Sequence, residues 1–215
     1  MRIQRDQVIA AALSLLDEGG LEGVTMRKLA DVLEVKAASL YWHFENKQAL
    51  IDGMADVLVD AVARDLSKSQ SWEDTLRQVA GELRDALRVR RDGARVYAGT
   101  YVVTDNVMRT GEAMIAACIR AGADPALAAD TAFSLLYFVL GFVMEEQALD
   151  LEGGVDLHER ADAFMALATK SYPCSLKAAD SIFSQDFDAR FETGMELLVG
   201  GLAALLARRR KSRRP

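Results

Sequence analysis

The chain has 215 residues, half of them hydrophobic, which is enough for one or two domains with a buried core. Its net charge of −6 excludes a protein that coats nucleic acid through a general positive field. Cys118 and Cys174 stand far apart in the sequence, which favours free thiols in a reducing cytoplasm over a disulfide-stabilised secreted protein.

The first 66 residues are dominated by apolar residues at helical spacing. Gly19-Gly20 predicts the end of the first helix, and Thr25 and Asn46 are the expected N-caps of the second and fourth. The start of the chain has no cleavage site typical of a signal peptide, so we expect a cytoplasmic protein. The predicted helices cover about residues 5–18, 25–33, 37–43 and 47–66.

The rest of the chain also shows helical patterns and no alternation typical of strands, so the predicted fold class is all-α. Ser71 and Asp124 are expected N-caps, and Pro125 suits a first helical position. The longest apolar run, 132–144, predicts that no segment spans a bilayer. The predicted helices cover about 71–89, 94–99, 105–121, 125–149, 156–170 and 186–209, with an irregular stretch around Pro173. The last helix carries the apolar stripe Phe187, Phe191, Met195, Leu198, Leu202 and Leu205.

Residues 25–47 carry the most informative pattern, two short helices flanking a tight turn at 33–36. Inward-facing apolar residues would hold these helices at a fixed angle, as a helix-turn-helix requires. The exposed side of the second of them would then carry small, polar and aromatic residues able to approach base edges and phosphates. The alternative is that Tyr41 and Trp42 are core aromatics of a small helical domain. The expected inward-facing residues are Leu29, Ala30, Leu33, Val35 and Leu40.

The segment LYWHFENKQALIDGMAD, which begins at Leu40, resembles the junction of the third and fourth helices in the tetracycline-repressor (TetR) family. Further likenesses extend over most of the chain, more faintly after residue 150. They are Ser71-Trp72, RDGARV from Arg91, Gly99-Thr100, and Gly141 with Glu145-Glu146-Gln147.

The resemblance implies a helix-turn-helix domain at 1–47, a ligand-binding and dimerisation domain at 48–210 and a basic tail at 211–215. It also implies double-stranded operator DNA as a partner. The expected DNA-binding residues are Thr25, Arg27, Lys36, Ala37, Ala38, Ser39, Tyr41, Trp42, His43 and Lys47.

Two features depart from the family pattern. Glu34 stands in the turn where glycine is common, and a left-handed backbone there would cost about 1–2 kcal/mol. A turn of another shape is equally open. Ala37-Ala38 offers few hydrogen bonds, so base reading would depend on methyl contacts and DNA shape.

The second domain is expected to pair with a second copy and to enclose a ligand. The helices at 125–149 and 186–209 are the most apolar, and glycines on them would allow close approach in a homodimer. The alternative is that these helices form the core of a monomer. A flat, partly apolar inducer would suit the expected ligand-binding residues, unless these form only an aromatic-rich core. The ligand-binding candidates are Leu83, Tyr97, Thr100, Tyr101, Met114, Phe133, Tyr137 and Glu145.

The tetracycline repressors bind a magnesium–drug chelate through a histidine just before the Gly-Thr step, and Tyr97 holds that position here. Another pocket histidine of the family falls at Tyr137. A phenol is a poor magnesium ligand at neutral pH, and Glu145 alone does not make a metal site. We therefore expect no metal or cofactor and an aromatic or polyketide-like inducer other than magnesium–tetracycline.

The expected function is a repressor that leaves its operator when the inducer shifts the fourth helix. A constitutive DNA-binding regulator without an inducer is the main alternative. A helical enzyme is disfavoured because no nucleophile–base pair, phosphate loop or metal cluster is evident. The basic segment 208–215, which includes this tail, is interpreted as a solvated helix end, with a non-specific DNA tether as its alternative.

Overall fold

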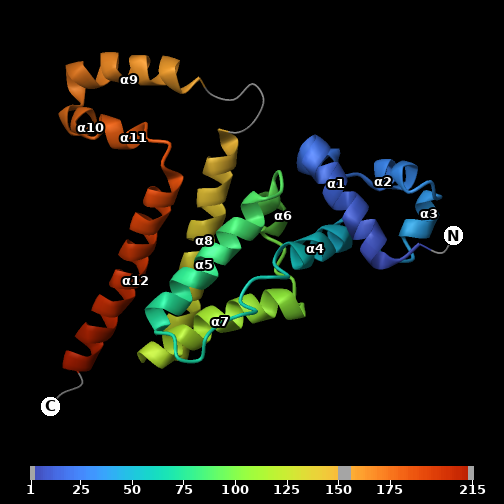
Figure 1. The fold of residues 1–215 in the computed structure, drawn as a ribbon, viewed down its shortest axis with the longest axis horizontal. Coiled ribbons are helices and arrows are strands. Elements are labelled where there is room, and N and C mark those ends of the chain that lie inside the picture. Colours follow the sequence, from blue (N-terminus) through green and yellow to red (C-terminus); the bar gives the residue numbers. More distant parts are fainter. Residues whose placement is uncertain (1–2, 150–155, 213–215) are drawn as a thin grey trace.

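The computed structural model describes residues 3–149 and 156–212, and all regular secondary structure in these ranges is helical (Figure 1). The predicted all-α class is confirmed. The helices are α1 (Arg5–Gly23), α2 (Met26–Val32), α3 (Ala37–Leu40), α4 (Lys47–Leu58), α5 (Trp72–Arg88), α6 (Gly93–Tyr97), α7 (Asp105–Ala121), α8 (Pro125–Ala148), α9 (Leu157–Ser171), α10 (Pro173–Lys177), α11 (Ala179–Ile182) and α12 (Phe187–Ser212).

Helices α1 to α3 form a small unit at one end of the molecule, and α4 joins it to the remaining helices (Figure 1). The predicted caps are confirmed: Thr25 accepts a hydrogen bond from the Lys28 amide at 3.2 Å, and Asn46 from the Ala49 amide at 2.9 Å. The predicted break at Gly19-Gly20 is a kink within α1, where Gly20 has φ 66°. Leu16, Leu29, Leu40, Phe44 and, on α4, Leu50 are buried here, and they belong to one hydrophobic cluster that continues into the remaining helices.

α4 is shorter than its sequence pattern predicts, because it ends at Leu58 and not near residue 66. The chain beyond it forms turns, and Ala63 adopts a left-handed backbone with φ 58°. Side chains of other helices bind this backbone: Glu82 accepts from the Ala63 amide, and Arg109 donates to carbonyls at 59–62. These tertiary bonds replace the helical ones that the periodicity favoured.

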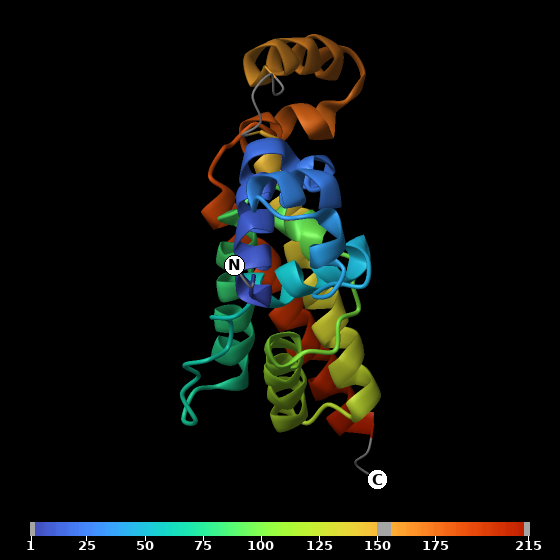
Figure 2. The ribbon, with the colours of Figure 1, turned by 90° about the vertical axis from the view of Figure 1, so that its right-hand side faces the viewer.

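Helices α5, α7 and α8 pack together as the centre of the larger unit, and α12 lies along α8 on the side away from α1–α3 (Figures 1 and 2). Gly194 allows this close approach, since a Cβ there would lie 2.3 Å from the Phe138 ring. Arg84 on α5, which is buried, donates to both carboxylate oxygens of Glu146 on α8, at 2.7 and 3.0 Å. It also bonds Asp188 on α12 at 2.7 Å and so joins three helices.

Helices α9, α10 and α11 form an arm at one end of the molecule (Figures 1 and 2). The arm packs mainly on itself, with the rings of Phe164 and Phe183 edge to face at 5.1 Å. The expectation of an irregular stretch around Pro173 is wrong, because Pro173 begins α10 and α11 follows it. Proline suits a first helical position, where its missing N–H has no helical partner.

The two most apolar helices, α8 and α12, differ in detail from their sequence patterns. α8 is, by length and composition alone, apolar enough to cross a bilayer, a test that the core helix of a soluble protein also passes. The run of 13 residues covers only part of this 24-residue helix, whose first residues, 125–131, are also mostly apolar. In α12 the buried stripe is Phe191, Met195, Val199, Leu202 and Leu206, whereas Leu205 of the predicted stripe is 45% exposed.

Candidate DNA interface and ligand pocket

α2 and α3 are held together by a turn that buries their apolar faces. Leu29, Ala30 and Leu40 are buried, and the Val35 amide donates to the Ala30 carbonyl at 3.0 Å across the turn. Glu34 adopts the left-handed backbone with φ 53°, which decides the question that its sequence position left open. The backbone of this turn is strained at Glu34, but the buried residues on both sides of it hold α3 at a fixed angle at the surface.

The residues expected to contact DNA lie around α3 and at the neighbouring ends of α2 and α4. Trp42 is 89% and Tyr41 52% exposed, so the alternative that they are core aromatics is wrong for this pair; Phe44, only 2% exposed, fills that role. Ser39, His43 and Thr25 are partly exposed, and Thr25 is engaged as an N-cap. The remaining candidates, Arg27, Lys36, Ala37, Ala38 and Lys47, are exposed.

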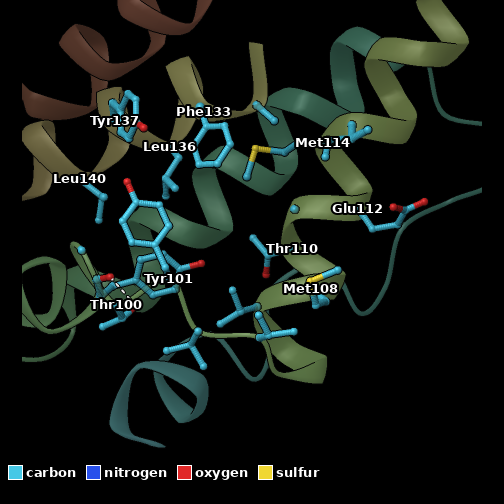
Figure 3. Close-up of a pocket in the computed structure, with 18 residues that line it drawn as sticks. Thr100, Tyr101, Met108, Thr110, Glu112, Met114, Phe133, Leu136, Tyr137 and Leu140 are labelled. Carbon is cyan, nitrogen blue, oxygen red and sulfur yellow. Dashed lines mark hydrogen bonds between the residues drawn. The ribbon is translucent and has the colours of Figure 1, made fainter. Parts of the chain in front are cut away.

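A cavity of about 380 Å³ lies between α7, α8 and the segment that follows α6 (Figure 3). Six of the eight ligand-binding candidates line it: Tyr97, Thr100, Tyr101, Met114, Phe133 and Tyr137. The other two do not. Leu83 is fully buried within α5, and Glu145 is exposed on α8 beyond the last lining residue of that helix, Leu140.

Sequence reasoning missed a further part of the lining, on the 99–104 segment, α7 and α8. Residues of α7 that share one face recur at helical spacing, and this period was a signal that could have found them. The 99–104 segment gave no such signal, because its irregular backbone follows no period. The additional lining residues are Gly99, Val102, Val103, Val107, Met108, Thr110, Gly111, Glu112, Ile115, Ala132, Leu136 and Leu140.

The chemistry of the pocket is apolar and aromatic with a few hydroxyls, and Glu112 is its charged lining residue. Burial raises the pKa of Tyr97 to about 12, with a smaller contribution from the charge of Asp56. The phenol therefore stays neutral at physiological pH and can donate a hydrogen bond. Within residues 3–149 and 156–212, no three His, Cys, Asp or Glu side chains come together in a group that could hold a metal ion.

Both units match known protein families. Residues 8–54 match the family described as bacterial regulatory proteins, tetR family, and residues 66–206 match the tetracyclin repressor-like C-terminal domain. The tetracycline repressor protein class C of Escherichia coli is 35% identical over 207 residues, which are 94% of this chain and 91% of that protein. The chain belongs to the TetR family. Its relatives are transcriptional regulators, and the resemblance read from the sequence is confirmed.

Solved structures of TetR-family proteins share the fold. A possible TetR family regulator from Streptomyces coelicolor A3(2) is 36% identical, with a TM-score of 0.84 over 94% of this chain and all of that one. ActR of Streptomyces coelicolor in complex with actinorhodin is 29% identical, with a TM-score of 0.82 over 94% and 96% of the two chains. BioQ with its double-stranded DNA operator is 29% identical, with a TM-score of 0.68 over 94% and 99%.

In this TetR-family chain, the larger unit, which contains the pocket and is called the ligand unit below, is joined to α1 by the loop before α6. Asp92, itself in a left-handed conformation with φ 57°, accepts a hydrogen bond from the Leu21 amide at 2.8 Å. Ion pairs of Arg90 with Asp17 and of Arg95 with Glu22 flank this bond. The sequence showed these charges but not their pairing, because their partners lie more than 70 positions away.

Proposed function

We propose that the protein is a homodimeric repressor that binds a two-half-site operator in the cytoplasm and is released by a small aromatic or polyketide-like molecule. The observation that carries the proposal is the presence, in one chain, of an exposed helix-turn-helix and an aromatic-lined pocket whose walls adjoin α4. The pocket also argues against an enzyme, because its lining offers no nucleophile–base pair. We assign 1–47 to DNA binding, 48–210 to ligand binding and dimerisation, and 211–215 to a tail, which lies largely outside the described residues.

The DNA-binding role is supported by the surface around α3. Ala37 and Ala38 leave the helix slender enough to enter a major groove, and the exposed ring of Trp42 can contact thymine methyls or the sugar-phosphate backbone. Arg27 and Lys47 lie on either side as phosphate contacts. BioQ, which shares the fold, was crystallised with its DNA operator.

The dimer is supported by apolar surface left exposed on α8 and α12. Leu197 is 72% exposed and Leu205 45%. A Cβ at Gly141, Gly200 or Gly201 would meet nothing within 4 Å in the single chain, so these positions are open to a second copy. A two-fold pairing of these helices would cover the apolar face and place two recognition surfaces on one operator.

The inducer class follows from the lining of the pocket. Tyr97, Tyr101, Phe133 and Tyr137 offer aromatic faces, and neutral hydroxyls supply hydrogen bonds, which suits a flat molecule with few charges. ActR, which shares the fold, was crystallised with actinorhodin. Tyr97 replaces the histidine that the resemblance assigned to magnesium, so we expect metal-independent binding.

Two experiments test the proposal. Selection of bound duplexes from a randomised library should yield a sequence with two half-sites about one helical turn apart. A thermal-shift screen over aromatic and polyketide compounds should then find one that raises the melting temperature and releases the selected duplex. A protein that binds DNA but responds to no compound would be the constitutive regulator, and a failure to enrich any sequence would refute the proposal.

A further inference from the structure

The first half of α7 contacts both the ligand pocket and the end of α4. Val107, Met108, Thr110 and Gly111 line the pocket (Figure 3). Arg109, interleaved with them, turns instead to the backbone that ends α4. A displacement of this helical segment by a bound molecule would therefore reach α4 directly.

Arg109 holds the C-terminal end of α4 through its guanidinium group. Its Nε donates to the Val62 carbonyl at 2.9 Å, and its Nη2 donates to the carbonyls of Val59, at 3.4 Å, and Asp60. The bound carbonyls belong to Val59, the C-cap of α4, and to the turns just beyond it, and a cation there suits the negative end of the helix dipole. Arg109 thus fixes where α4 ends and supplies the partners that a longer helix would have supplied.

Asn106, one turn earlier, completes the same junction. Its side-chain amide donates to the Asp56 carbonyl at 3.2 Å, and its oxygen accepts from Arg109 Nη1 at 2.9 Å. The buried atoms Asp56 Oδ1, on α4, and Thr104 Oγ1, at the start of α7, have no hydrogen-bond partner among the described residues. Buried unpaired oxygens cost free energy in the arrangement that contains them, which lowers the net cost of rearranging this junction.

α4 in turn is packed firmly into the DNA-binding unit. Leu50 and Met54 are fully buried, and a Cβ at Gly53 would lie within 3.2 Å of side-chain atoms of Phe44 and Ile9. The unit must therefore follow any movement of α4. In a dimer, such a movement changes the separation of the two recognition surfaces.

We propose that Arg109 is the positioning residue that transmits occupancy of the pocket to α4, an inference that rests on the proposed function. The competing route runs through α6, which packs against α4 and ends at Tyr97, a lining residue. That route consists of packing contacts. The α7 route consists of directed hydrogen bonds, one from Asn106 and three from the Arg109 guanidinium, and a single substitution at Arg109 removes those three.

The test compares operator affinity with the pocket empty and filled, by fluorescence anisotropy on the duplex selected by the wild type. Saturating actinorhodin is the probe, and we expect it to weaken wild-type binding at least tenfold. In Arg109→Gln, actinorhodin should weaken operator binding less than threefold, while the variant's own affinity for actinorhodin changes little. Arg109→Lys, which keeps the charge and some donors, should restore part of the weakening of operator binding by actinorhodin.

A matched control separates coupling from stability. Arg190 of α12 also donates to three backbone carbonyls, those of Ser181, Ile182 and Ser184, but these lie at the end of α11 and not at α4. Arg190→Gln should lower the melting temperature and leave the ratio of the two operator affinities unchanged. If Arg109 were merely structural, Arg109→Gln would behave in the same way, and the inference would be overturned.

A second arm fills the pocket without a ligand. A Cβ at Gly111 meets nothing within 4 Å, so Gly111→Phe places a ring in the cavity, and Gly111→Leu serves if phenylalanine prevents folding. The substitution should weaken operator binding in the wild type and much less in Arg109→Gln. An effect of Gly111→Phe without an effect of actinorhodin would refute the inducer class alone. Equal effects with and without Arg109, or no effect of either filling on the wild type, would refute the inference.

Discussion

The carboxylate of Asp92, in the loop before α6, accepts a hydrogen bond from the backbone amide of Leu21, just beyond the kink of α1. This contact fastens the ligand unit to the first helix of the DNA-binding unit, independently of α4. Gly20 makes room for it, since a Cβ there would lie 2.6 Å from the Asp92 carboxylate. In the part of the chain that the structure describes, the Asp92–Leu21 joint therefore links the two units in addition to α4.

Asp92→Ala should destabilise this joint. It removes a partly buried hydrogen bond to a charged acceptor and leaves the Leu21 amide unpaired, which costs about 1.5–3 kcal/mol of the free energy of unfolding. Asp92→Asn keeps an acceptor and tolerates the left-handed backbone, so its loss should be less than half as large. Urea unfolding of the two variants provides the comparison, and equal losses would show that the charge, not the bond, matters.

Glu34→Gly should stabilise the DNA-binding unit by about 0.5–1 kcal/mol, because glycine adopts the φ of 53° without the steric cost that an L side chain incurs. Glu34 is exposed, so little packing is lost. Glu34→Ala keeps the strain and is the control. Chemical denaturation measures both, and a stabilisation by alanine as large as that by glycine would rule out relief of backbone strain.

Trp42→Ala and Phe44→Ala should affect different properties, operator affinity and stability, although the two residues are only two positions apart. Trp42 is almost fully exposed, so its loss should leave the melting temperature nearly unchanged and weaken operator binding about tenfold. Phe44 is buried, and its truncation should cost about 3–5 kcal/mol of stability. Circular dichroism and anisotropy separate the two outcomes. A Trp42→Ala protein with unaltered operator affinity would remove Trp42 from the interface.

Tyr97 should ionise late. Burial raises its pKa to about 12, above the ordinary value of about 10, so the folded state favours the neutral phenol. The associated stability is therefore complete below about pH 10 and is lost as pH rises through about 12. Absorbance at the tyrosinate band should show a step near pH 12 that Tyr97→Phe removes. The same step in the variant would assign it to another tyrosine.

Local signals predicted most of the helices, and their success and failure have a common cause. Thr25, Asn46, Ser71 and Asp124 cap helices where the sequence placed them, because a cap acts within three or four residues. The predicted end of α4 was wrong, because the bonds that replace further helical turns come from Arg109, which is about 50 positions away.

The pocket also has one part that the sequence predicted and one part that only the tertiary structure shows. The aromatic candidates of α6 and α8 line it, and the resemblance had placed two of them, Tyr97 and Tyr137, at pocket positions of the family. The candidates Leu83 and Glu145 lie elsewhere. Thr100 and Tyr101 lie within the irregular segment 99–104, whose other lining residues, Gly99, Val102 and Val103, could be found only from the tertiary structure.

The most direct measurement of the central claim is a titration of the selected operator complex with actinorhodin, followed by fluorescence anisotropy at fixed salt. We expect the operator dissociation constant to rise at least tenfold at saturation, and by the same factor with or without magnesium. An operator affinity that stays constant while actinorhodin binds the protein would contradict coupling between the pocket and the DNA-binding unit.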